Sequence, residues 1–297
     1  MVTYQNERVT GLEQYYTPPE IAMQLTAKML EFAPIDAVWL EPAGGTGAFV
    51  DALLSLGIKD IESYDIDPLH DMVKFTKNFL KEDVSKLSGC VTITNPPFGR
   101  ANKLSVPFFN KCAEVSTYIG FVVPKSWRKW SVIDRLDNRF HLIYDRDLNI
   151  DYHHDEESDD KKGRLSTIFQ IWEKRNYTRP KTFVEDRGYI STATPKKADI
   201  CITSRGRGCG LVKTEFKRVE NTTQTFLSVS REWVVDAMKS IDFSVFYNNT
   251  AFVESLSVKE IMYLVNKYAD ENESDILKIR YSGIQTNLLG SCLGLKW

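Results

Sequence analysis

The chain has 297 residues, of which 42% are hydrophobic and 26% charged, as in an ordinary globular protein with one large or two medium domains. Apolar runs stay far below the roughly 20 residues of a membrane span, and the first residues lack the apolar centre of a signal peptide. The five cysteines are scattered and never form a CxxC pair, which disfavours a disulfide framework and a metal site. We therefore expect an intracellular protein, cytoplasmic or otherwise, with neither a membrane nor a metal partner.

The net charge of −2 conceals an uneven distribution of charge along the chain. Residues 174–218 hold twelve Lys or Arg and four Asp or Glu, so this span carries a net charge of +8 and the remainder −10. A basic segment of this kind favours nucleic acid as a partner. A solvated basic surface is the alternative interpretation.

The first predicted element is a helix that begins within residues 15–20, Tyr-Tyr-Thr-Pro-Pro-Glu. Thr17 fits the N-cap, Pro18 the first helical position and Glu20 the third. Four apolar residues then recur at helical spacing and predict one buried face: Ile21, Leu25, Met29 and Phe32. This start is either simply a well-capped helix or one whose N-terminal amides face an anion.

A glycine-rich turn follows a predicted short strand at residues 37–41. Residues 42–49 read Pro-Ala-Gly-Gly-Thr-Gly-Ala-Phe, and a helix is expected to continue from Val50. Strand, turn and helix in this order bring the backbone close to a ligand at the end of a sheet. The turn is neither the dinucleotide GxGxxG fingerprint nor a P-loop, because no Gly-Lys-Ser/Thr sequence follows it.

A second strand is predicted from residue 61 and ends in carboxylates, at the spacing from the turn at which an acid can accept hydrogen bonds from ribose hydroxyls. Asp65 is the candidate for that role. Asp67 is interpreted instead as the cap of a helix that begins at Pro68. The inward face of that helix is predicted to consist of Met72, Phe75 and Phe79.

The most informative stretch is residues 91–99, Val-Thr-Ile-Thr-Asn-Pro-Pro-Phe-Gly. Its first four residues predict a buried strand, which must end at Pro96 and Pro97 because proline donates nothing to a ladder. The Asn95 side-chain oxygen and the Pro96 carbonyl can both accept hydrogen bonds from one amino group and aim its lone pair at an electrophile. Phe98 offers a flat face on which the ring that carries the amine can stack. A structural Pro-Pro turn is the alternative.

Further strands and helices are predicted downstream of this motif. Residues 118–124 form another buried strand, followed by a basic, aromatic helix start at 125–130. Residues 142–144 and 167–172 are predicted as a closing strand pair, with a polar loop at 151–163 between them. The alternation of strands and helices predicts an α/β protein whose parallel-rich sheet has helices on both faces.

After residue 172 the pattern changes to short strands and longer helices, which predicts a second, smaller α+β region. Strands are expected at 182–184 and 199–202, and helices at 230–240 and 257–270. The candidate phosphate contacts in this basic region are Lys196, Lys197, Arg205 and Arg207. A solvated surface remains the alternative for these four residues.

Taken together, these motifs resemble the S-adenosylmethionine-dependent N6-adenine methyltransferases, in the order of the gamma-type DNA enzymes. The likeness covers roughly residues 14–172. It comprises the Thr-Pro-Pro-Glu helix start, the Glu-Pro-x-x-Gly-x-Gly turn, Asp-Ile-Asp-Pro and the Asn-Pro-Pro-Phe (NPPF) motif. It implies a Rossmann-like seven-stranded methyltransferase sheet in residues 1–172, and a nucleic-acid target-recognition domain in residues 173–297.

The resemblance also implies roles for single residues toward S-adenosylmethionine. The methionine end would meet Tyr16, Thr17 and Pro18. The turn beneath the cofactor would comprise Glu41, Pro42, Ala43, Gly44, Gly45 and Gly47, with Phe49 packing nearby. Asp65 would hold the ribose, with Ile66 against the adenine. The family usually has Asp where this chain has Asn78, next to Phe79, so the contact with the cofactor's adenine amine would rest on an amide oxygen.

The catalytic set would be Asn95, Pro96, Pro97 and Phe98, with Asn95 also bordering the cofactor, and Tyr152 is a candidate for a second aromatic against the target base. The implied activity is transfer of a methyl group to the N6 amine of a flipped or unpaired adenine in DNA, in a restriction-modification system, a mobile element or a virus. RNA is the alternative substrate. A protein glutamine methyltransferase is disfavoured by Phe98, because the related loop usually ends in Tyr, and an inactive nucleic-acid-binding relative is disfavoured by the intact NPPF motif.

Overall fold

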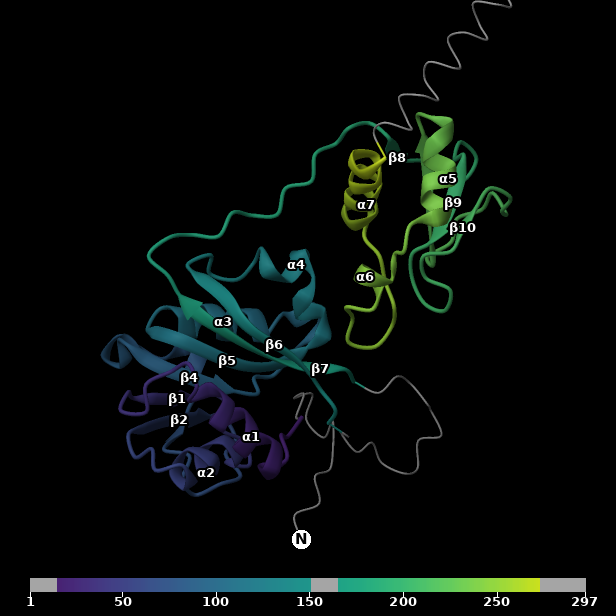
Figure 1. The fold of residues 1–297 in the computed structure, drawn as a ribbon. Coiled ribbons are helices and arrows are strands. Elements are labelled where there is room, and N and C mark those ends of the chain that lie inside the picture. The colour runs from purple at the N-terminus through teal and green to yellow at the C-terminus, as the bar shows by residue number, and fades with distance from the viewer. Residues whose placement is uncertain (1–14, 151–164, 273–297) are drawn as a thin grey trace, which may run out of the picture. The chain divides into compact units, whose positions relative to one another are not determined.

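A computed structural model describes residues 15–150 and 165–272 of the chain (Figure 1). The chain divides into two compact units. The first unit comprises the described residues up to Thr182 together with Thr250–Phe252, and the second comprises Phe183–Asn249 and the described residues from Val253 onward. None of the helices in the described ranges is long and apolar enough to cross a membrane.

The first unit contains a seven-stranded sheet of order β3-β2-β1-β4-β5-β7-β6. Only β7 runs antiparallel to its neighbours β5 and β6. The strands are β1 Trp39–Glu41, β2 Ile61–Asp65, β3 Phe75–Thr76, β4 Cys90–Thr94, β5 Ser116–Pro124, β6 Phe140–Leu148 and β7 Thr167–Lys174. All five residues of β4 are buried, as expected for a central strand covered on both faces. The predicted closing pair is confirmed as β6 and β7.

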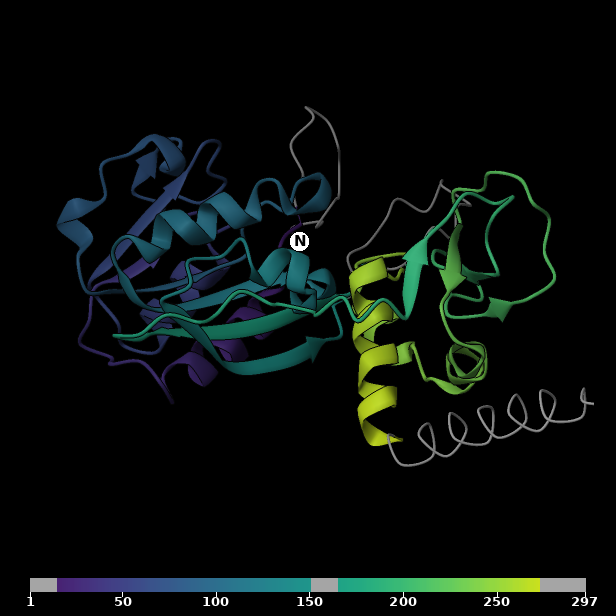
Figure 2. The same ribbon diagram turned by 90° about the horizontal axis from the view of Figure 1, so that it is seen from above.

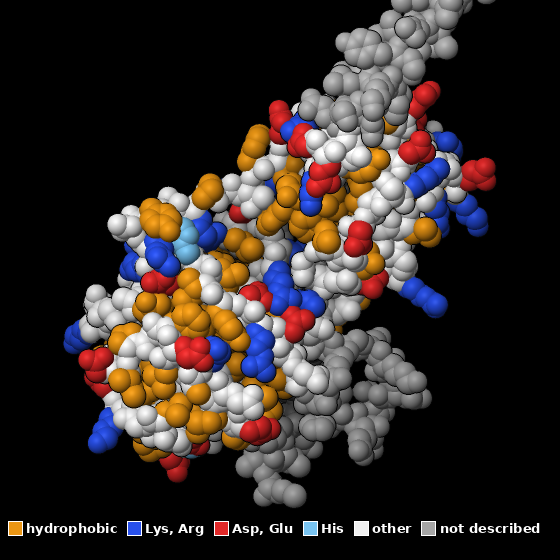
Figure 3. Space-filling model, in the orientation of Figure 1, with side chains coloured by type: hydrophobic (Ala, Val, Ile, Leu, Met, Phe, Trp, Pro, Cys, Tyr) orange, Lys and Arg blue, Asp and Glu red, His pale blue; other side chains and the backbone are white. Residues whose placement is uncertain are grey.

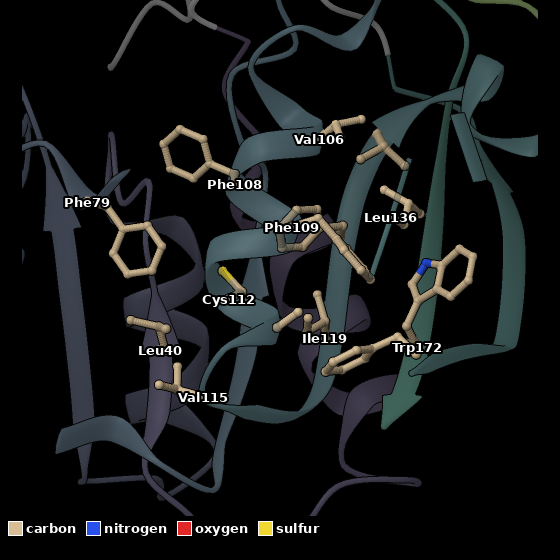
Figure 4. Close-up of a cluster of buried hydrophobic side chains, with 14 of the residues drawn as sticks. Leu40, Phe79, Val106, Phe108, Phe109, Cys112, Val115, Ile119, Leu136 and Trp172 are labelled. Carbon is tan, nitrogen blue, oxygen red and sulfur yellow. The ribbon is translucent and has the colours of Figure 1, made fainter. Parts of the chain in front are cut away.

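Helices cover both faces of this sheet (Figure 2). They are α1 Pro19–Met29, α2 Ala48–Ser55, α3 Ser105–Ala113 and α4 Trp130–Ile133, with short 3-10 turns η1 Phe79–Lys81, η2 Ser85–Leu87, η3 Arg100–Asn102 and η4 Lys125–Arg128. On the α3 face, the fully buried ring of Phe109 makes edge contacts with Phe121, Phe140 and Trp172. Figure 4 shows Phe109 within this cluster of buried apolar side chains. On the other face, α1 and α2 pack against Trp39, Val91 and Val122. The predicted α/β sheet with helices on both faces is therefore confirmed.

The second unit is an antiparallel four-stranded sheet of order β10-β9-β11-β8 with helices on one face. Its elements are β8 Ile190–Thr192, β9 Ile200–Thr203, β10 Val212–Lys213, β11 Gln224–Val229, α5 Glu232–Ser240, α6 Ser244–Tyr247 and α7 Val258–Glu271. Helix α7 begins with a capping box formed by Ser257 and Glu260. The core combines Ile200 and Leu227 of the sheet with Val234 of α5 and Ile261 of α7. This agrees with the predicted α+β region and its two helices.

Three local predictions are wrong, and one of them concerns the segment after Pro68. No helix begins there: the chain runs as a loop to β3, where Phe75 pairs with Tyr64 of β2 and stacks on its ring at 4.9 Å. Met72, predicted to point inward, is 51% exposed. The hydroxyl of Ser63 fastens the loop by donating to the Met72 carbonyl and accepting from the Lys74 amide. Pairing with β2 therefore overrides the helical spacing of the apolar residues, and Asp67 caps no helix.

The other two corrections concern the start of α1 and residues 182–184. Pro18, not Thr17, is the N-cap of α1, with no side-chain cap, because the Thr17 hydroxyl accepts a hydrogen bond from Asn95 instead. Residues 182–184 form no strand. Thr182 is held by the Asp134 carboxylate through its amide and its hydroxyl, and the next side chain, Phe183, is 83% exposed.

Candidate active site

A cavity of about 420 Å³ lies where β1, β2 and β4 end at their carboxyl edges, the place at which open α/β sheets bind ligands. The predicted residues that line it are Tyr16, Thr17, Pro42, Ala43, Gly44, Gly45, Phe49, Asp65, Ile66, Asn78, Phe79, Asn95, Pro96 and Pro97. The residues that sequence reasoning missed are Tyr15, Thr46, Ala48, Asp67, Lys77, Leu80, Gly99, Arg100, Leu104 and Phe108. Pro18, Glu41, Gly47 and Phe98 were predicted as site residues but do not line the cavity.

The glycine-rich turn forms the floor of this cavity. Gly45 and Gly47 have φ angles of 47° and 78°, a region that favours glycine. A Cβ atom on Gly45 would lie 3.1 Å from the ring of Tyr16, so the absence of a side chain lets this aromatic residue approach the backbone. Burial and the nearby carboxylates of Asp65 and Asp67 raise the pKa of Tyr16, which keeps its hydroxyl protonated at neutral pH.

Glu41 lies beneath the turn, with only 1% of its surface exposed. Its Oε1 atom accepts hydrogen bonds from the Ala43 amide at 2.9 Å and from the Thr94 hydroxyl at 2.5 Å. Burial raises the pKa of this carboxyl to about 8, although both hydrogen bonds favour the charged form. Glu41 therefore connects the turn to the end of β4, and its predicted role toward the cofactor stays a prediction.

Asp65 is the last residue of β2 and faces the turn. Its Oδ2 atom accepts from the Gly45 amide and its Oδ1 atom from the Asp67 amide, both at 2.8 Å. A carboxylate has about four lone-pair positions, so each oxygen can still accept one hydroxyl from a ligand. The two backbone donors thus fix the orientation of the carboxylate at the cavity.

Asn78 and Phe79 form the adjoining wall of the cavity. The Asn78 side-chain oxygen accepts from the Leu80 amide at 3.1 Å and caps the short η1 turn. An amide oxygen can accept a second hydrogen bond, so the predicted contact with an adenine amine remains sterically and chemically open. Phe79 is buried, whereas Ile66 is 52% exposed and offers an apolar surface at the rim.

Asn95 follows β4 directly, and its amide has one possible orientation. Nδ2 lies 2.6 Å from the Tyr15 carbonyl oxygen and 3.1 Å from the Thr17 hydroxyl oxygen. A backbone carbonyl only accepts hydrogen bonds, so the atom that faces it must be the amide nitrogen. Oδ1 is consequently left as a buried acceptor without a hydrogen-bond partner among the described residues. Such an atom is costly unless a ligand donates to it.

Phe98 differs from the prediction of an open stacking face. Its side chain is 4% exposed and belongs to a small apolar cluster with Ile150 and Leu165. Tyr15 lies parallel to it, with a centroid distance of 5.4 Å and an interplanar angle of 17°. The flat face of Phe98 is thus present but covered in this conformation. The other predicted aromatic, Tyr152, lies outside the described residues.

The loop after Phe98 is conformationally unusual. Gly99 is followed by two non-glycine residues in the left-handed region, Ala101 with φ 57° and Asn102 with φ 60°. Such residues are held there by their surroundings: the Arg135 guanidinium donates to the Ala101 carbonyl, and the Asn102 side-chain nitrogen Nδ2 donates to the Ser126 hydroxyl. This turn presents the exposed Arg100 side chain at the edge of the cavity.

The four candidate phosphate contacts all lie exposed in the second unit, in turns that flank β9: Lys196, Lys197, Arg205 and Arg207. Figure 3 shows that Lys and Arg side chains stand out from the part of this unit that carries β9 and β10. Not every basic residue is free for a ligand. Arg218 donates to the carbonyls of Pro195, Lys196 and Ala198 and so holds the turn that carries the two lysines.

Comparison with known proteins gives a short sequence match and several distant structural ones. No family model matches the chain. Over 101 residues it is 31% identical to the type II methyltransferases M.HincII of Haemophilus influenzae and M.HindII of Haemophilus influenzae strain Rd. The match covers 32% of this chain but only 19% and 18% of those proteins, so the chain matches about a fifth of the length of these curated relatives.

Two solved structures illustrate the structural neighbours. One is described as a "putative RNA methyltransferase" from Pyrococcus horikoshii, with TM-score 0.44, 19% identity and coverage of 57% of this chain and 90% of that one. The other is a modification subunit of a "putative type I restriction enzyme" from Vibrio vulnificus, with TM-score 0.40, 15% identity and coverage of 56% and 46%. The strand order, with antiparallel β7 between β5 and β6, is that of the Rossmann-like methyltransferase fold. The sequence match relates the chain to methyltransferases.

Proposed function

We propose that this chain is an S-adenosylmethionine-dependent methyltransferase that acts on the N6 amine of adenine in nucleic acid, with DNA the favoured substrate. The observation that carries the proposal is the buried Oδ1 atom of Asn95, which has no partner among the described residues and belongs to a residue that lines the same cavity as the glycine-rich turn. An exocyclic amino group would satisfy this acceptor. The type II methyltransferases matched in sequence support the reaction class.

The cavity residues fit S-adenosylmethionine. Tyr16 and Gly45, which lie close together at the cavity wall, would meet the methionine end. Asp65, fixed by two backbone amides, would accept the ribose hydroxyls, and Asn78 and Phe79 would bound the adenine. The same cavity also contains Asn95 and Pro96, so both ends of a transfer reaction would meet within it.

When bound, S-adenosylmethionine would supply a methyl group on a positively charged sulfur, which is already an electrophile. The task of the protein is then to orient the amine and exclude water. Asn95 Oδ1 and the Pro96 carbonyl would each accept one N–H of the amine, so that its lone pair points at the methyl carbon. Formation of the N–C bond would release the thioether by cleavage of the C–S bond, and the amine would then lose a proton. No strong base is needed before attack.

Duplex DNA hides the amine within the base stack, so the target adenine must be flipped out or presented unpaired. The exposed basic residues around β9 support binding of the phosphate backbone by the second unit. The Thr-Pro-Pro-Glu helix start and this downstream region favour DNA over RNA as the substrate. RNA is the second candidate, because the same amine occurs there and the Asn-Pro-Pro-Phe loop makes no contact that identifies the sugar.

The test is transfer of labelled methyl from S-adenosylmethionine to unmethylated duplex DNA, single-stranded DNA and RNA, with modified nucleosides identified by mass spectrometry. We expect N6-methyladenine in DNA, lost in Asn95→Ala but not in Lys103→Ala, an exposed neighbour that does not line the cavity. Calorimetry should give nearly the same cofactor Kd for all three proteins. Label in RNA alone would change the substrate but keep the chemistry, and activity in Asn95→Ala would contradict the mechanism.

A further inference from the structure

Tyr15 covers the face of Phe98 that the proposed reaction needs. The two rings lie nearly parallel at 5.4 Å, the geometry in which a nucleobase stacks on an aromatic side chain. Phe98 is 4% exposed, so an approaching base finds no free face on it in this conformation. A base can therefore stack on Phe98, as the proposed function requires, only if one of the side chains packed against Phe98 moves.

The covers of Phe98 differ in how readily they can move. Ile150 and Leu165 are each 4% exposed and form the buried part of the cluster. Tyr15 is only half-buried, precedes α1 in a segment without regular structure and lines the cavity. Its ring is thus less enclosed than the side chains of Ile150 and Leu165. Among residues 15–150 and 165–272, it is also the only aromatic side chain in the cluster with Phe98.

The backbone of Tyr15 has a separate task. Its carbonyl oxygen lies 2.6 Å from Asn95 Nδ2 and fixes the orientation of the side-chain amide, which leaves Oδ1 without a hydrogen-bond partner among the described residues. A rotation about the side-chain bonds of Tyr15 leaves this carbonyl in place. The ring can therefore leave Phe98 while the acceptor atom of Asn95 keeps its orientation.

We propose that the Tyr15 ring occupies the stacking position of the target adenine on Phe98 and is displaced when the base enters. This inference deepens the proposed function and rests on it. Tyr15 acts as a positioning residue. Its ring excludes water from the face of Phe98, and a base replaces it only if the binding free energy of the base exceeds the stacking free energy of Tyr15. Stacking of two aromatic side chains raises the equilibrium constant for their contact by a factor of about 2 to 10 beyond the effect of area burial. Stacking of a base on an aromatic side chain raises the binding constant by a factor of about 5 to 150. An adenine whose amine also donates a hydrogen bond to Asn95 can therefore displace the ring. A base without this amine lacks the hydrogen bond and gains less binding free energy.

The experiment compares wild type, Tyr15→Ala, Tyr15→Phe and the control Lys103→Ala. The substrate is unmethylated DNA, and the readouts are kcat, the KM for DNA and the calorimetric Kd for S-adenosylmethionine. We expect Tyr15→Ala to lower the KM for DNA by about 2- to 10-fold, because the competitor for Phe98 is gone. Tyr15→Phe should behave as wild type, and the cofactor Kd should change by less than about twofold. If Tyr15→Ala unfolds, Tyr15→Leu, which keeps apolar cover but has no flat ring, replaces it.

A second readout follows the base itself. In a duplex whose target adenine is replaced by 2-aminopurine, fluorescence rises when that base leaves the stack. We expect a larger rise with Tyr15→Ala than with wild type, and a smaller rise with Phe98→Ala. A raised KM in Tyr15→Ala would show that Tyr15 is a platform for the base and would overturn the inference, as would an unchanged KM. Absence of transfer by wild type to any nucleic acid would instead overturn the proposed function itself.

Discussion

Glu41 and Thr94 join neighbouring strands β1 and β4 below the glycine-rich turn, with the Thr94 hydroxyl donating to the Glu41 carboxyl across 2.5 Å. The same carboxyl oxygen accepts from the Ala43 amide. One buried side chain thus connects the turn that would hold the cofactor to the strand that ends at Asn95. This contact adds to the backbone pairing of β1 with β4 at the end of the two strands.

The free energy of unfolding should depend on pH through the titration of Glu41. Burial raises its pKa from 4.5 to about 8, so the folded state binds this proton more tightly than the unfolded state. The resulting stabilisation is complete below pH 4.5, falls as the pH rises toward 8 and changes no further above that. Glu41→Gln, which is neutral at every pH, should lack this slope. Urea denaturation at several pH values between 5 and 8.5 checks it, and parallel curves for the two proteins would contradict it.

The sequence alone predicted the central parts of this site because they depend on local chemistry. The Pro-Pro pair ends β4 at Asn95, and the glycines mark a turn that needs positive φ angles. Asp65 could be placed because carboxyl ends of parallel strands meet at one edge of a sheet. These features require no knowledge of distant contacts.

Features set by tertiary contacts were missed. The segment after Pro68 has helical spacing of apolar residues, but pairing of β3 with β2 prevails. Thr17 has the chemistry of an N-cap, yet its hydroxyl is taken by Asn95, 78 positions away. The stacking of Tyr15 on Phe98 likewise joins residues far apart in the chain, and no periodic pattern indicates it. The near-complete burial of Glu41 and its hydrogen bond to Thr94 also could not be predicted, because Thr94 lies 53 positions away in the chain.

The Thr17 hydroxyl should contribute to the orientation of Asn95. It lies 3.1 Å from Nδ2 and is 3% exposed, so Thr17→Val keeps the shape of the side chain but removes the acceptor. We expect kcat to fall about 2- to 10-fold, because one hydrogen bond is worth about 0.5–1.5 kcal/mol and the Tyr15 carbonyl still holds the amide. Thr17→Ser should restore kcat. A loss that Thr17→Ser does not rescue would indicate a packing defect instead.

Asn78 offers a change that should improve cofactor binding. Its oxygen already accepts from the Leu80 amide, and a carboxylate could accept from that amide and from an adenine amine more strongly. We expect Asn78→Asp to lower the Kd for S-adenosylmethionine about 2- to 10-fold by calorimetry, whereas Asn78→Ala should raise it. Asn138→Asp, which makes the same charge change on an exposed residue outside this cavity, serves as the control. Equal effects of both Asp variants would assign the gain to net charge.

Arg100 should contact a phosphate next to the target nucleotide. It is exposed at the edge of the cavity, two residues after Phe98, and the left-handed turn at Ala101 and Asn102 holds it there. Loss of one phosphate contact weakens binding to all sequences alike and lowers the salt slope of log K by about 1. Arg100→Ala should therefore raise the KM for DNA and reduce its dependence on salt, without changing the cofactor Kd. Lys103→Ala removes an equal charge from the same loop and should leave the slope unchanged. Equal slopes for Arg100→Ala and wild type would exclude a phosphate contact by Arg100.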